Sequence, residues 1–153
     1  MLPRLAALSL LLLAAFCAVA ALADDRTGFA DKPAPTDFRG LPFGAAIADL
    51  PGLTPVPSQK DSYYRKDEEP TYGKAKIVSV AYYAREGKLF AVGMAVEGEA
   101  NIFLVQDRLI QQFGQGSQRG DQYGWIWPSF SVVLKRVNKD KAAVYFTQER
   151  AGR

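Results

Sequence analysis

The chain has 153 residues, with 19 lysines and arginines against 16 aspartates and glutamates, no histidine and a single cysteine, Cys17. A balance so close to neutral argues against a nucleic-acid-binding protein, because such proteins usually concentrate basic residues on one face. Without histidine, and without cysteine beyond residue 17, the chain lacks Ser-His and Cys-His nucleophile systems and the usual zinc ligand sets. Its length suits one domain with a core of its own.

The first 23 residues have the pattern of a secretory signal peptide. Arg4 precedes a run without charge, and this run closes with Ala21-Leu22-Ala23, a small-x-small cleavage site. Cleavage after Ala23 would leave 130 of the 153 residues, in the periplasm or secreted, with no cysteine and no stable membrane insertion. A lipoprotein that uses Cys17 is the alternative, although Phe16 stands where a small residue is needed.

The next stretch, residues 24–36, is rich in proline and aperiodic, which predicts a flexible leader. A single domain is then expected over residues 37–149. Three elements are expected in its first part: a short helix at 45–50 ended by Pro51-Gly52, a strand at 62–66, and a charged loop at 67–70.

Residues 76–83 and 88–96 are β-branched and aromatic and flank Arg85-Glu86-Gly87, a pattern typical of a β-hairpin. Glycine at the last position favours a three-residue loop, because glycine adopts a positive φ without steric cost. This loop places large side chains on one face of the hairpin. The other face is made mostly of small side chains, and Tyr83 and Leu89 lie on it as well. The expected large pairs are Tyr82 with Phe90, Val80 with Val92, and Val78 with Met94.

Residues 100–114 predict an amphipathic helix, with Gly114 suited to its C-terminal end. The large face of the hairpin is the expected cover for its apolar side. The apolar stripe, at helical spacing, consists of Ile102, Val105, Leu109 and Phe113, widened by Phe103 and Ile110.

Residues 121–127 and 130–136 alternate with period two around Pro128-Ser129, and residues 142–147 predict a last strand. The order of elements is then helix, three strands, helix, three strands. The expected fold is α+β, an antiparallel β-sheet with helices packed on one face, built from two αβββ-like units. A two-residue turn would place Tyr123, Trp125 and Trp127 opposite Leu134, Val132 and Phe130, as core.

Several short patterns together carry a family resemblance. They are Phe38-x-Gly40-x-x-Phe43-Gly44, the paired tyrosines, the hairpin with Gly87-Lys88-Leu89, Asn101 at the start of the helix, Phe113-Gly114, and a Trp-centred strand. Over nearly the whole mature chain they resemble a group of uncharacterised exported bacterial proteins, which implies a fold and a compartment but no activity. The order of elements also resembles β-lactamase-inhibitor-like folds and small outer-membrane-assembly lipoprotein folds, whose members act by binding other proteins.

Carboxylates remain as candidates for catalysis, since a pair of acids can supply both proton donor and acceptor. Three of them are adjacent in one charged loop and the others lie at predicted strand or helix ends, which favours solvated side chains. The sequence shows neither a loop spaced for calcium ligands nor a glycine-rich phosphate motif, so we expect no catalytic residue, metal or cofactor. The six candidates are Asp67, Glu68, Glu69, Glu97, Glu99 and Asp121.

The far face of the expected sheet is small and mildly apolar, whereas sheet faces in water usually carry long polar side chains. Contiguous apolar surface tends to be covered or to bind something. The hypothesis is a docking face for an envelope protein or peptide, with Tyr83, Leu89, Ile126 and Val133 as anchors and Lys135 at the rim. Alternatively the leader or a neighbouring subunit covers this face, or it stays empty.

The sequence therefore favours a non-catalytic cell-envelope module that binds a protein or peptide. The alternative function is a small-ligand carrier, or a weak carboxylate-based enzyme, with a pocket between helix and sheet.

Overall fold

The computed structural model describes residues 30–150, so the predicted signal peptide and residues 24–29 of the predicted leader lie outside the described range. Strands hold 47% of the described residues and helices 15%, which makes the fold mostly β. The prediction of an α+β fold with two αβββ-like units is therefore wrong. The first predicted helix is only a 3-10 turn, η1 (Ile47–Asp49), because the stretch before Pro51 is too short to offset the cost of helix nucleation.

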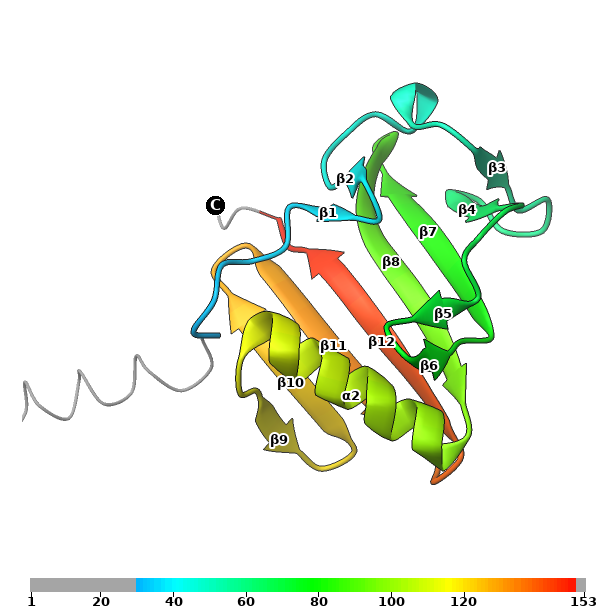
Figure 1. Cartoon of the computed structure of the whole chain (residues 1–153). Helices are drawn as coiled ribbons and strands as arrows, with labels where there is room; N and C mark the ends of the chain where they lie inside the picture. The colour runs from blue at the N-terminus through cyan, green and yellow to red at the C-terminus, as the bar shows by residue number, and fades with distance from the viewer. Residues whose placement is uncertain (1–29, 151–153) are drawn as a thin grey trace, which may run out of the picture.

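Eight antiparallel strands form the main sheet (Figure 1). Its first four and last four strands are two meanders, and the last strand in the chain, β12, joins them by pairing with β8. In spatial order the strands are β3 (Leu53–Pro55), β4 (Ser62–Arg65), β7 (Ser79–Arg85), β8 (Lys88–Glu97), β12 (Lys141–Gln148), β11 (Phe130–Arg136), β10 (Gln122–Trp127) and β9 (Ser117–Arg119).

Within residues 30–150 the one α-helix, α2 (Glu99–Phe113), carries the chain from β8 to the far edge strand β9. Its 15 residues extend about 22 Å, and the four strand spacings from β8 to β9 measure about 19 Å, so its length matches the crossing. Phe103 was predicted to widen the apolar stripe but is 66% exposed. Ile110, the other residue predicted to widen it, is partly buried, and the four central residues Ile102, Val105, Leu109 and Phe113 are buried.

Two small hairpins cover the part of the sheet that the helix does not reach. β1 (Asp37–Phe38) pairs with β2 (Leu41–Pro42), and β5 (Thr71–Tyr72) pairs with β6 (Ala75–Lys76). Figure 1 shows both hairpins on the same side of the sheet as α2. The Phe38 ring centroid lies 5.1 Å from that of Phe146 on β12. These hairpins occupy the place in which a second helix was predicted.

The β7–β8 hairpin forms, but its turn and register differ from the prediction. Arg85 pairs with Lys88 around the two-residue loop Glu86-Gly87, and a β-bulge follows between Tyr83 and Ala84. Both loop residues have positive φ, 53° and 73°, as in a type I′ turn that matches the twist of the strands. The three-residue loop was predicted from Gly87 and from the segregation of large and small side chains, but residue type reveals neither the positive φ at Glu86 nor the bulge.

The β10–β11 hairpin has the predicted register. Its large residues pair across the turn as Tyr123 with Leu134, Trp125 with Val132, and Trp127 with Phe130, and all six are buried. The indole N–H of Trp125 donates to the carbonyl of Gly114 at 2.8 Å. The indole N–H of Trp127 donates to the carbonyl of Lys32, also at 2.8 Å, so this part of the predicted leader lies against the domain.

Candidate functional site

The face of the main sheet that points away from α2 is called the open face below. Its side chains alternate along each strand with the buried ones, because successive residues of a strand point to opposite faces. Arg119, Lys135 and the ion pair of Lys141 with Glu97 lie near the end of the sheet where β12 begins, and Arg85 and Lys88, which pair beside the hairpin turn, lie at the opposite end. Between these two ends most residues are small or apolar: Ala81, Tyr83, Ala91, Gly93, Ala95, Gly124, Ile126, Ser131, Val133, Ala143, Tyr145 and Thr147.

Four of the five predicted binding residues lie on the open face, namely Tyr83, Ile126, Val133 and Lys135. Leu89 does not. It pairs with Ala84 beyond the β-bulge and is fully buried, so its placement among the anchors was wrong. The bulge is the cause, because one extra residue in a strand reverses the alternation of faces beyond it.

Tyr145, which the sequence did not single out, links these residues. It pairs with Val133 on one side and with Gly93 on the other, and it is 44% exposed. A Cβ at Gly93 would lie 3.3 Å from the Tyr83 ring and 3.4 Å from the Tyr145 ring, so both rings lie over this glycine. Burial raises the pKa of the Tyr83 hydroxyl, and the neighbouring Tyr145 raises it further.

Ile126, Val133, Tyr145 and Tyr83 together form an apolar band across the sheet. The band runs over five strands, from β10 to β7, and therefore extends about 19 Å. Alternation within residues 142–147 could have placed Tyr145 on the same face as Ala143. Its position beside Gly93 depends on the pairing of β12 with β8, for which the local pattern contains no information.

A small hollow opens at one end of the band. Its volume is about 70 Å³, and its lining comes from β9, β10 and β11. Gly124 forms its floor, since a residue without a side chain leaves the space above the strand empty. The remaining lining residues are Ser117, Arg119, Gln122, Ile126 and Val133.

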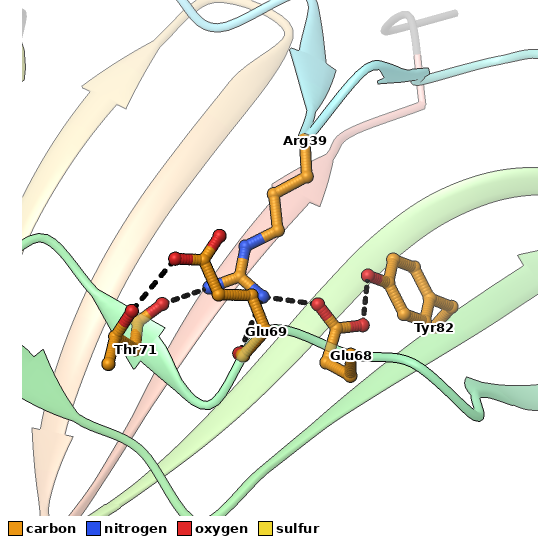
Figure 2. A network of polar contacts seen from close by, with 5 residues as sticks. All are labelled: Arg39, Glu68, Glu69, Thr71 and Tyr82. Atoms are coloured by element: carbon orange, nitrogen blue, oxygen red, sulfur yellow. Dashed lines mark hydrogen bonds and ion pairs between the residues drawn. The ribbon is translucent and has the colours of Figure 1, made fainter.

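A separate polar cluster lies on the core side of the sheet, where Arg39 reaches the loop at 67–70 (Figure 2). The Arg39 guanidinium donates to the Glu68 carboxylate and to the carbonyls of Glu69 and Thr71. The Tyr82 hydroxyl donates to the other Glu68 oxygen at 2.6 Å. Burial raises the pKa of Tyr82 well above 10, and the hydrogen bond to Glu68 and the charge of Glu68 raise it further.

This cluster connects the β1–β2 turn, the acidic loop and β7, and it uses two of the six carboxylates that were candidates for catalysis, Glu68 and Glu69. Both oxygens of Glu68 have partners, and Glu69 accepts a hydrogen bond from the Thr71 hydroxyl at 2.9 Å. Glu97 pairs with Lys141 on the surface. Within residues 30–150, no group of three or more acidic, histidine or cysteine side chains is arranged to hold a metal ion.

A cleft of about 400 Å³ lies between the β1–β2 hairpin and the C-terminal end of α2, where the alternative function expected a pocket. Its aromatic walls include Phe38, Phe113 and Phe146, all of which are buried in the core, so the cleft offers little of their surface. Tyr72 donates to Gln112 beside it. Burial raises the pKa of Tyr72 to about 12, although the charges of Arg108 and Arg39 act in the opposite direction.

Comparisons of this chain with protein-family models, curated proteins and solved structures found no match. The family resemblance drawn from the sequence therefore stays a prediction. In the described part of the chain, no helix combines the length and the apolar character needed to cross a bilayer.

Proposed function

We propose that this protein is a non-catalytic module of the cell envelope that binds an extended segment of another protein through the open face. One observation carries the proposal: the eight-stranded sheet has its core on one face, and on the other face no segment of residues 30–150 covers the apolar band. The envelope location rests on the signal-peptide pattern of the first 23 residues.

The composition of the open face supports binding. Ile126 and Tyr145 are 50% and 44% exposed although they are large, and small residues around them allow a partner backbone to approach closely. Tyrosines are common energetic centres of interfaces, because they supply a large contact area with few rotatable bonds. The carboxylates on the core side are held in the Arg39 cluster, which favours binding over acid-base chemistry as the function.

The test places a photo-crosslinking amino acid at Ile126, at Tyr145, or at the control position Phe103, which is exposed on α2 on the other side of the sheet. In intact cells we expect the same protein adduct from Ile126 and Tyr145 and none from Phe103. With the crosslinker at Tyr145, the substitution Ile126→Lys should abolish that adduct. Identical adducts from Phe103, or no adduct from the open face, would overturn the proposal.

A small-ligand carrier is the second candidate, and the cleft of about 400 Å³ is the observation that favours it, since ligand pockets begin at about 300 Å³. An apolar fluorescent dye such as anilinonaphthalene sulfonate separates the two candidates. Loss of dye binding in Gln112→Trp, which fills the cleft, supports the carrier. Loss of dye binding in Ile126→Lys, with normal dye binding in Gln112→Trp, supports binding at the open face.

A further inference from the structure

The hollow over Gly124 is too small for a cofactor and suits a single side chain. Its volume of about 70 Å³ is far below the roughly 300 Å³ of a small-molecule pocket. Its apolar walls, Ile126 and Val133, belong to the apolar band, so a chain lying on the band can insert one side chain here. A Cβ at Gly124 would lie 3.4 and 3.5 Å from its nearest neighbours, so the hollow can be filled without disrupting the sheet.

Two cations lie at one side of this hollow: Arg119 belongs to its lining, and Lys135 follows the lining residue Val133 two positions along β11. Arg119 pairs with Gln122, and Gln122 pairs with Lys135, so the three side chains share one row of the open face. Two strand spacings separate the cations by about 10 Å. Among residues 30–150, neither cation lies within ion-pair distance of an acidic side chain. The end of the open face beside the hollow is therefore positively charged.

We propose that the hollow anchors an acidic peptide segment that inserts one apolar side chain over Gly124, next to the row that carries Arg119 and Lys135. The proposal rests on the proposed function and names the chemistry of the partner. In an extended peptide, residues two apart point the same way and lie about 7 Å from each other. Val133 and Lys135 have the same spacing on β11, so an apolar residue followed two positions later by Asp or Glu fits the pair. A nucleic acid fits less well, because only two cations lie beside an apolar hollow.

The proposal is tested by measuring the affinity of the purified protein for synthetic nonapeptides with fluorescence anisotropy. Each peptide has a central Leu or Phe and, two residues away on both sides, Asp, Ser or Lys. We expect the Asp peptides to bind most tightly, and the double variant Arg119→Glu/Lys135→Glu to weaken them about tenfold, because attraction to two cations at the rim becomes repulsion. The same variant should favour the Lys peptides. Gly124→Ala, which narrows the hollow, should weaken Leu and Phe peptides alike.

The matched control is Lys60→Glu/Lys66→Glu, two exposed lysines beside β4 at the other edge of the sheet, which changes the net charge equally and should leave binding within about twofold. Circular dichroism and thermal unfolding confirm that each variant is folded.

The outcomes separate this proposal from the proposed function. If Ile126→Lys abolishes peptide binding while Arg119→Glu/Lys135→Glu has no effect, the open face still binds but the acidic-partner inference is overturned. If neither variant affects binding, or if no peptide binds at millimolar concentration, both the proposed function and the acidic-partner inference are overturned. Equal binding of a single-stranded oligonucleotide overturns the inference in favour of a nucleic acid. Tighter peptide binding after deletion of residues 24–29, which contain Asp24, Asp25 and Phe29, overturns it in favour of a segment of this chain.

Discussion

Arg39 is unusual in both its backbone and its side chain. Its φ is 52°, in the left-handed region that residues other than glycine seldom adopt, and Gly40 after it has a φ of 80°. The pair forms the β1–β2 turn and directs the guanidinium into the Glu68 cluster. The side chains of Arg39 and Glu68 are only 18% and 15% exposed, so each depends on the other for a charged partner.

Glu68→Ala should therefore lower the free energy of unfolding by about 3 kcal/mol, because it leaves the Arg39 guanidinium and the Tyr82 hydroxyl without their acceptor. Urea denaturation measures the loss. The matched control is Glu69→Ala, the exposed neighbour, which loses one hydrogen bond and should cost at most about 1 kcal/mol. Equal losses in the two variants would show that the cluster is not the source of the effect.

The raised pKa values of Tyr72 and Tyr82 predict a loss of stability in alkali. Below pH 10 both the folded and the unfolded states keep these protons, so the contribution is fully present. Above pH 10 the unfolded state loses them first, and stability falls as the pH approaches the folded pKa, which is about 12 for Tyr72. Tyr72→Phe should flatten this decline when urea midpoints are measured from neutral pH to pH 12. A decline as steep as that of the unchanged protein, or of the exposed control Tyr64→Phe, would refute the assignment.

At the scale of elements, the connection between α2 and β9 packs closely against β10. The Gly116 N–H and the Gln115 side chain both donate to the Tyr123 hydroxyl, at 3.0 and 2.8 Å. A Cβ at Gly116 would lie 2.6 Å from the Tyr123 ring and 2.8 Å from the Gly124 carbonyl oxygen. No side chain fits there without a shift of the β10 backbone.

Gly116→Ala should thus destabilise the protein by about 2 kcal/mol through overpacking, as measured by thermal or urea unfolding. The control on the facing strand is Gly124→Ala, whose Cβ meets only ordinary van der Waals distances of 3.4 and 3.5 Å and should cost clearly less. If Gly116→Ala were as stable as Gly124→Ala, the connection between α2 and β9 would have to shift more easily than its contacts imply.

For the molecule as a whole, the last strand in the chain completes the centre of the sheet. β12 pairs with both β8 and β11, and its Ala142, Val144 and Phe146 side chains are buried. The two meanders share no other strand pairing. Neither meander can therefore complete the sheet until the chain has been synthesised to the end of β12.

A chain that ends at Asp140 should lack cooperative thermal unfolding by circular dichroism, because β8 and β11 would each lose a central neighbour. A chain that ends at Arg150 is the control and should unfold like the full chain. Cooperative unfolding of the shorter chain would mean that the meanders are independent folding units.

The local pattern of the sequence was sufficient for elements whose partners are close in the chain. Alternation around Pro128-Ser129 determined the β10–β11 register, helical spacing determined the buried side of α2, and segregation of large from small residues identified most of the open face. These features follow from side-chain period and turn residues, which are properties of short segments.

Tertiary structure decided the rest. Insertion of β12 beside β8 brought Tyr145 into the apolar band, the β1–β2 and β5–β6 hairpins took the place of a second helix, and one bulge moved Leu89 into the core. The physical reason is that pairing between distant strands depends on which edges and apolar faces remain uncovered once local elements have formed. A single extra residue then exchanges the two faces of a strand without changing the composition of the sequence around it.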